Sequence, residues 1–178
     1  LRDRFGLVFH LDFYSTEDIA EILRRSARRL GVPYDPDALE RLAGRARGTP
    51  RVANRLLRRT RDFAQVRGQG RLDVRTVDQA LDILQIDDHG LDEQDRSYLR
   101  ALIQTYNGGP AGVEALAASL GQERDTLEDV VEPFLLQIGF VARTRQGRVA
   151  TRAAYEHLSV PYREPADGRD ATDQDSLF

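Results

Sequence analysis

The 178-residue sequence contains no cysteine, and all 26 of its basic residues are arginine. Without cysteine there can be no disulfide, no thiol nucleophile and no thiolate-ligated metal. Its three histidines, His10, His89 and His157, lie too far apart for a local zinc motif, so we expect no metal site. The exclusive use of arginine over lysine offers guanidinium groups for phosphate, but it more often reflects a GC-rich genome.

Long apolar runs are also missing. No stretch approaches the roughly 18 consecutive apolar residues of a membrane span, and the N-terminus lacks the basic and then apolar pattern of a secretory signal. We therefore expect a cytoplasmic protein without a membrane partner. The formal net charge of -3 excludes a uniformly basic nucleic-acid binder, so any contact with DNA must come from a local patch.

The first half of the chain predicts one strand and four helices. Apolar and polar residues alternate over residues 7–13, as in a strand with one buried face, and such a strand needs a sheet around it. Because the chain also begins without methionine, we expect residues 1–14 to be the end of a larger α/β domain. Periodicity and capping signals predict helices over residues 16–30, 37–45, 50–66 and 75–84, which would form a small bundle over residues 15–86.

The second half predicts a winged helix. Residues 85–91, with two aspartates and a glycine, are interpreted as a hinge. Helices are then expected over residues 92–106, 113–120 and 126–138, followed by strands over residues 140–144 and 148–151. Three helices and a β-hairpin, the wing, are typical of a winged-helix domain, here over residues 87–162. The polar tail, residues 163–178, predicts disorder, and the fold class is mainly α.

Candidate residues for phosphate chemistry lie in the first half. Arg51 falls in the first turn of a helix that Thr49 caps and Pro50 begins, where free N–H groups and the helix dipole favour an anion. Arg4 precedes the predicted strand and could reach a nucleotide held by a neighbouring subunit. Tyr14 ends that strand and could stack on a base. Each residue has a plain alternative: Arg51 could be solvated, Arg4 could form an ordinary ion pair, and Tyr14 could lie at the edge of the core.

The predicted hairpin carries a second candidate site. Arg143, Arg145 and Arg148 form the densest basic patch outside a helix, and Arg152 follows at the start of the next helix. Guanidinium groups on a wing can lie along phosphates, which predicts salt-sensitive DNA binding without base specificity, although a merely solvated hairpin is the alternative. A further cluster on helix 50–66 is interpreted as solvated or subunit-facing surface without a DNA role: Arg55, Arg58, Arg59 and Arg61.

Several short motifs, taken in order, resemble the RuvB family of bacterial Holliday-junction branch-migration ATPases. The likeness spans residues 1–162, and its joint order and spacing make coincidence very improbable. The motifs are Arg-Asp-Arg-Phe-Gly at residues 2–6, Leu-Asp-Phe-Tyr at 11–14, Arg-Ala-Arg-Gly-Thr-Pro-Arg-Val-Ala-Asn-Arg-Leu at 45–56, Arg-Asp-Phe-Ala at 61–64, Gly-Gly-Pro at 108–110 and Glu-Pro-Phe-Leu at 132–135.

The resemblance implies an AAA+ motor that forms homo-hexameric rings around DNA, uses ATP and Mg²⁺, and works with RuvA and RuvC. Residues 1–14 would end its ATPase core, 15–86 would form the helical lid, and 87–162 the DNA-binding winged helix. The family's arginine finger, which acts on the neighbouring subunit, matches Arg4. Its sensor 2 arginine matches Arg51, with Pro50 and Tyr14 near the nucleotide.

The resemblance also implies that Arg148 is a wing residue that contacts DNA. The wing tip departs from the family pattern, because Thr-Arg-Gln-Gly-Arg stands at residues 144–148 where Thr-Pro-Arg-Gly-Arg is usual. Neighbours on a strand point to opposite faces, so Arg145 is not a simple replacement and Arg148 is the better candidate.

The chain contains no Gly-x-x-x-x-Gly-Lys-Ser/Thr loop and no apolar run that ends in paired acids. By itself it is expected neither to bind ATP tightly nor to hydrolyse it, and binding of RuvA to this stretch alone is doubtful. Two alternatives remain open. One is the lid and winged helix of another AAA+ protein, such as a replication initiator. The other is a free-standing winged-helix regulator, which would read bases with residues 126–138, although that stretch is acidic.

Overall fold

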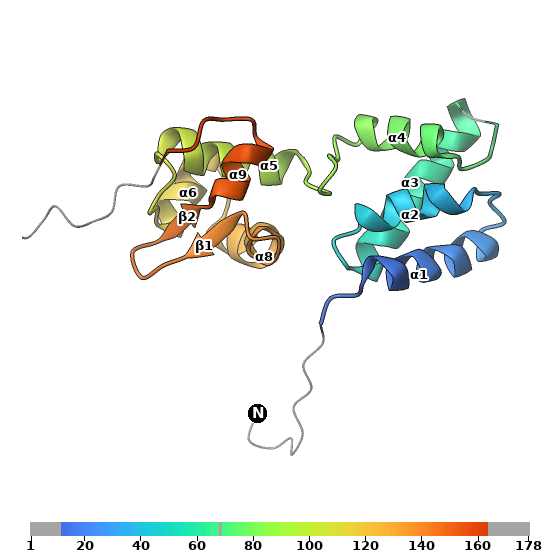
Figure 1. Cartoon of the computed structure of the whole chain (residues 1–178), viewed down its shortest axis with the longest axis horizontal. Helices are drawn as coiled ribbons and strands as arrows, with labels where there is room; N and C mark the ends of the chain where they lie inside the picture. The colour runs from blue at the N-terminus through green and yellow to red at the C-terminus, as the bar shows by residue number, and fades with distance from the viewer. Residues whose placement is uncertain (1–11, 68, 164–178) are drawn as a thin grey trace, which may run out of the picture. The chain divides into compact units, whose positions relative to one another are not determined.

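The computed structural model describes residues 12–67 and 69–163, and helices predominate within them (Figure 1). The chain divides into two compact units, the first ending at Asp92 and the second beginning at Glu93. Arg4 and the predicted disordered tail from residue 164 onward lie outside the described residues. So does most of the predicted strand 7–13, and its last two residues, Asp12 and Phe13, belong to no strand. No helix in the described ranges is long and apolar enough to cross a membrane.

The first unit contains the four predicted helices, α1 (Thr16–Arg29), α2 (Pro36–Gly44), α3 (Pro50–Arg67) and α4 (Val74–Ile83). Their starts follow from local side-chain chemistry. The Ser15 hydroxyl accepts a hydrogen bond from the Asp18 N–H at 3.1 Å, and the Asp73 carboxylate accepts one from the Thr76 N–H at 2.7 Å. The four-helix expectation is therefore confirmed, with boundaries that shift by a few residues.

Apolar side chains at helical spacing make the core of this unit. A short parallel bridge between Tyr34 and Leu72 joins the α1–α2 loop to the α3–α4 loop, so the two ends of the bundle on that side are tied by backbone hydrogen bonds. The fully buried residues include Ile19, Leu23, Leu39, Leu42, Leu57 and Leu72.

The second unit follows the order predicted for a winged helix. Its helical segments are α5 (Glu93–Arg100), η2 (Ala101–Thr105), α6 (Val113–Leu120), α7 (Arg124–Thr126), η3 (Leu127–Val131), α8 (Glu132–Gln137) and α9 (Arg152–His157). Strands β1 (Val141–Arg143) and β2 (Arg148–Ala150) form the antiparallel hairpin between α8 and α9. Both η segments are π-helical turns. The second of them directly precedes the turn that contains Pro133, which has no N–H and would clash with the carbonyl of Asp129 in a regular helix.

The hairpin has a third partner that the sequence did not predict. Ala111, in the loop between η2 and α6, bridges to Arg148 with N···O distances of 2.9 and 2.8 Å. The approach is too close for side chains. A Cβ on Gly109, which has a φ of +98°, would lie 2.2 Å from the Arg148 carbonyl oxygen, and one on Gly147 would lie 2.5 Å from that of Ala111. The Gly-Gly-Pro motif therefore permits the loop to lie against the wing.

Replacing Gly109 by alanine tests this close approach. We expect Gly109→Ala to destabilise the second unit by about 2 to 4 kcal/mol, because it adds a steric clash to an unfavourable φ. Urea denaturation followed by the amide NMR signals of this unit measures the loss. Gly112→Ala is the control, since Gly112 has a φ of -70° and open space around it, and it should change stability by less than about 1 kcal/mol. Equal effects of the two substitutions would contradict the explanation.

Candidate functional site

The start of α3 is the first candidate site. Its first turn contains no acidic residue, and Arg51 is exposed there without an ion-pair partner among the described residues. Thr49 precedes the helix, and its carbonyl accepts from the Ala53 N–H at 3.0 Å. The Thr49 hydroxyl donates to the Arg47 carbonyl at 3.2 Å instead of accepting from a helix N–H, so the predicted cap by Thr49 is wrong.

Tyr14 lies beside this helix start. Its N–H donates to the Gly48 carbonyl at 3.0 Å, and a Cβ on Gly48 would lie only 2.8 Å from the Tyr14 carbonyl oxygen. The Tyr14 side chain is half exposed, so it does not close the core. The structure thus brings the backbone of Tyr14 to the loop that leads into Pro50 and Arg51.

The other arginines of α3 form an exposed surface, as expected. Arg55, Arg58 and Arg59 are exposed and share a helix face with Arg51, while Arg61 pairs with Asp62 at 2.6 Å. No group of three or more histidine, aspartate or glutamate side chains within the described residues is arranged to hold a metal ion.

The wing is the second candidate site, and two of its arginines converge on one carboxylate. Arg143 and Arg148 face each other across β1 and β2. Arg143 donates to Glu132 Oε2 from Nε at 2.9 Å and from Nη2 at 2.5 Å. Arg148 donates from Nε to Glu132 Oε1 at 2.9 Å. Two cations directly opposite each other on a sheet repel, so the carboxylate beneath them is what permits the pair.

Glu132 itself is completely buried, with an exposed fraction of 0%. Besides the two arginines it accepts a hydrogen bond of 2.9 Å from the hydroxyl of Tyr98, on α5. Burial, together with the negative charge of Glu132, raises the pKa of Tyr98, so its hydroxyl remains a hydrogen-bond donor. A buried carboxylate of this kind is tolerated because its charge is paired and its oxygens are hydrogen-bonded.

A second carboxylate compensates the rest of the charge on Arg148. Its Nη2 donates to Glu128 Oε1 at 2.6 Å, and Glu128 also accepts from Arg124 Nε at 2.7 Å. Hydrogen bonds from Arg124 and then Arg148 lower the pKa of Glu128 below its usual value. The Arg148 side chain is only 14% exposed. The arginine that the sequence favoured most for DNA is therefore the least accessible of the three in the wing.

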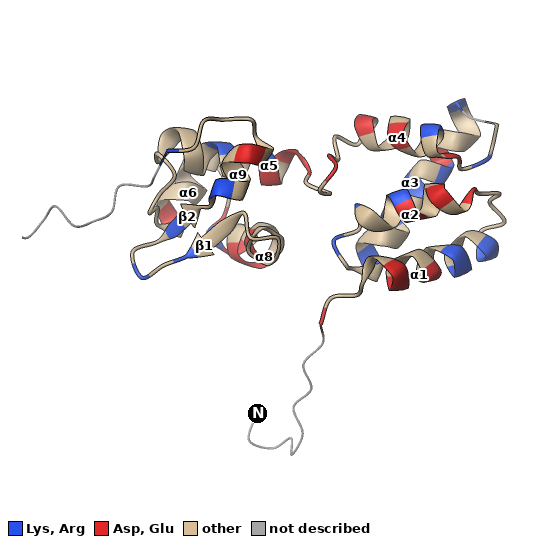
Figure 2. Cartoon of the chain, viewed as in Figure 1, with Lys and Arg blue, Asp and Glu red and all other residues tan. Residues whose placement is uncertain are grey.

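Arg145 is in the opposite situation. It is exposed in the turn between β1 and β2, and within the described residues it has no ion pair. The turn is ordered by Thr144, whose hydroxyl accepts from the N–H groups of Gln146 and Gly147 at 3.2 Å each. Figure 2 shows basic residues at the end of the hairpin, while the helical turns of η3 and α8 carry acidic ones. Arg143 is intermediate, with its side chain 47% exposed.

Glu132 and Tyr98, which organise the wing, were not predicted from the sequence. A signal was present, because Glu128 and Glu132 are four residues apart and so share one helix face immediately before an arginine-rich hairpin. Which arginines meet that face depends on the hairpin register, which a periodic pattern does not specify for strands of three residues.

Removing the buried carboxylate should unfold the wing. We expect Glu132→Ala to destabilise the second unit by about 3 to 5 kcal/mol, because it leaves Arg143 and Arg148 without their common partner. Urea denaturation of the second unit measures this loss. Asp129→Ala is the control, since Asp129 is an exposed acid on η3, three residues before Glu132, and it should change stability by less than about 0.5 kcal/mol. A stable Glu132→Ala variant would show that the ion cluster does not hold the hairpin.

Comparison with known proteins assigns both units to one family. The model of the RuvB AAA lid domain matches residues 14–87, and that of the RuvB C-terminal winged helix domain matches residues 88–159. Chloroflexus aurantiacus RuvB, a Holliday junction branch migration complex subunit, is 54% identical over 100% of this chain and 52% of its own length. The Dehalococcoides mccartyi protein of the same name is 55% identical over 91% of this chain and 46% of its own length.

A solved structure agrees. The Thermotoga maritima RuvB Holliday junction branch migration motor superimposes with a TM-score of 0.88 at 48% identity, covering 91% of this chain and 54% of that protein. The chain spans about half the length of the relatives it matches. These matches favour the RuvB resemblance over the replication initiator and the free-standing regulator. With RuvB lid and winged-helix domains matching in sequence, and RuvB structures matching in fold, the chain belongs to the RuvB family.

Proposed function

We propose that this chain supplies the lid and the DNA-binding wing of an ATP-driven motor that moves Holliday junctions. The observation that carries the proposal is the presence, in one chain, of both RuvB domains with an accessible arginine at each candidate site, Arg51 and Arg145. In the proposed motor the lid senses the nucleotide and the winged helix holds DNA.

The start of α3 fits a nucleotide phosphate. Arg51 presents an uncompensated guanidinium beside free helix N–H groups, and no acid in the first turn competes with an anion. Tyr14, half exposed beside Gly48, and Pro50 would border the nucleotide. ATP with Mg²⁺ supplies the phosphoanhydride bond whose cleavage drives the motor. Arg4 would act as the arginine finger in trans, and this role belongs to a residue outside the described part of the chain.

The wing fits the phosphate backbone of DNA. Arg145 is accessible at its turn, and Arg143 keeps half of its side chain exposed. Arg148 would contact DNA only where a phosphate competes with Glu128 and Glu132 for its guanidinium, so we assign it first to holding the wing. Contacts to phosphate rather than to base edges suit a motor that moves along any sequence.

The partners follow from the same proposal. A homo-hexameric ring around DNA would place Arg4 of one subunit beside the nucleotide of the next, and RuvA and RuvC would join it at the junction. The Chloroflexus and Dehalococcoides relatives are each named as a subunit of a branch migration complex, which supports assembly with other proteins.

Binding of this chain to DNA tests the wing. We expect Arg145→Ala to weaken binding to a four-way junction and to duplex about 3- to 10-fold, and to reduce the slope of log K against log salt by about 1, because one phosphate contact is lost. Fluorescence anisotropy across salt concentrations measures both. Arg71→Ala, which removes an exposed arginine of the first unit, is the control. Unlike Arg145→Ala, Arg148→Ala should unfold the wing, because Arg148 is bound to Glu132 and Glu128. Faster hydrogen exchange of the β2 amides would report this unfolding. Undiminished binding by Arg145→Ala would exclude this residue as a contact.

Hydrolysis of ATP by the full-length protein tests Arg51. We expect Arg51→Ala to lower kcat about 100- to 1000-fold, since a charged donor to the reacting phosphates is removed. Arg58→Ala on the same helix is the matched control and should leave the rate within about twofold. Equal rates for the two variants would remove Arg51 from the nucleotide site.

A further inference from the structure

The loop between α2 and α3, residues 45–49, leads into α3 and also contacts two other segments of the first unit, one at Tyr14 and one at residues 88–92. Arg47 and Gly48 in this loop have φ values of +57° and +61°. Glycine adopts this conformation freely but arginine does not, so the conformation of Arg47 must be stabilised by its contacts. Contacts of this loop lead to the chain entering the first unit, through Gly48, and to the chain leaving it, through Arg45 and Arg47.

On the entering side, the contact is between backbones. The Tyr14 N–H donates to the Gly48 carbonyl, and the lack of a side chain on Gly48 lets the two backbone segments approach each other. Arg51 follows Gly48 by three residues. The loop therefore joins the entering chain directly to the end of α3 that carries the proposed phosphate-binding arginine.

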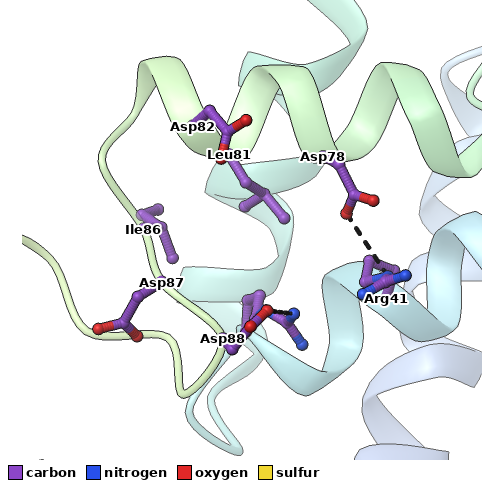
Figure 3. A pocket seen from close by; sticks show the side chains of 8 residues that line it. Arg41, Asp78, Leu81, Asp82, Ile86, Asp87 and Asp88 are labelled. Atoms are coloured by element: carbon purple, nitrogen blue, oxygen red, sulfur yellow. Dashed lines mark hydrogen bonds and ion pairs between the residues drawn. The ribbon is translucent and has the colours of Figure 1, made fainter. Parts of the chain in front are cut away.

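On the leaving side, two arginines hold the segment of residues 86–92. Arg47 donates from Nε to the Gly90 carbonyl at 2.8 Å and from Nη2 to Asp92 Oδ2 at 3.2 Å, with its side chain only 16% exposed. Arg45 forms an ion pair with Asp88, and Figure 3 shows the dashed line that ends on the labelled Asp88 side chain. Gly90 packs so closely that a Cβ there would lie 2.8 Å from the Arg45 carbonyl oxygen.

The held segment is itself ordered. The carboxylate of Asp87 accepts from the N–H groups of His89 and Leu91 at 3.0 and 2.9 Å, and the Asp87 N–H donates to the Leu91 carbonyl at 3.0 Å. Residues 85–91, predicted as a hinge, are therefore bound to the first unit. The next residue after Asp92, Glu93, begins α5 of the winged helix.

We propose that Arg47, with Arg45 in support, is a positioning residue that couples the phosphate-sensing end of α3 to the entrance of the winged-helix unit. A displacement of the α3 start by nucleotide turnover is passed through the loop to residues 88–92, and from there to α5. Because this assigns a mechanical role within the motor, it rests on the function proposed above. The contacts on which the coupling role rests all lie within the first unit.

Hydrogen exchange of this chain tests whether Arg47 holds residues 87–92. We expect Arg47→Ala to speed amide exchange at residues 87–92 at least tenfold, while the buried amides of α1 and α3 keep their protection. Arg47→Lys should give an intermediate rate, since an ammonium cannot replace the planar fork that reaches both Gly90 and Asp92. Arg71→Ala, which breaks an ion pair with Asp35 elsewhere in the same unit, should leave residues 87–92 unchanged. Unchanged exchange in Arg47→Ala would overturn the proposal.

Coupling is then measured in the full-length protein. We expect Arg47→Ala to keep ATP hydrolysis and junction affinity within about twofold of the wild type, but to lower branch migration per ATP about tenfold, with partial rescue by Arg47→Lys. Migration and hydrolysis falling together would make Arg47 part of the nucleotide site and overturn the coupling role, as would unchanged migration. If the wild type itself neither hydrolyses ATP nor migrates junctions, the proposed function fails, and the coupling role fails with it while the exchange result stands.

Discussion

The buried carboxylate of Glu132 is the interaction on which the geometry of the wing depends. A two-stranded hairpin with three residues in each strand has too little pairing to be stable by itself. Here it is held from both sides, by the Ala111 bridge along one edge and by the Arg143 and Arg148 guanidinium groups on Glu132 below. Breaking such a buried cluster costs about 3 to 5 kcal/mol, a large part of the stability of a domain of this size.

The same cluster decides which arginines are available to a ligand. In a chain that has arginine and no lysine, composition makes every arginine a candidate for phosphate, and the carboxylates decide which of them are available. Glu128 and Glu132 pair with Arg148, whereas Arg145 and Arg51 form no ion pair within the described residues. A compensated arginine has little net charge to attract phosphate, so local pairing matters more than the net charge of -3.

Much of the fold could be predicted, because its signals are local. Capping by Ser15 and Asp73 and the apolar periodicity of four helices depend on residues within one or two turns. The Ala111 bridge, the π turn before Pro133 and the partners of Arg148 could not, since each depends on segments that meet only in the folded state. The candidate site shows the same division. The place of Arg51 at a helix start could be predicted from local signals, whereas the burial of Arg148 depends on Glu128 and Glu132, which meet it only in the folded state.

The motif at residues 45–51 contains arginines with two different roles, ligand binding in the proposed function and positioning of the chain. Arg51 is exposed and suited to a ligand, whereas Arg45 and Arg47 are turned to the segment that leads into the second unit. Spacing places all three arginines in one short stretch, and only the contacts separate binding from positioning. Gly48, next to Arg47 in the same loop, also accepts the hydrogen bond from the Tyr14 N–H, so the proposed coupling would act on the entering as well as the leaving chain. That shared constraint is the physical reason to expect that nucleotide and DNA are coupled through this loop.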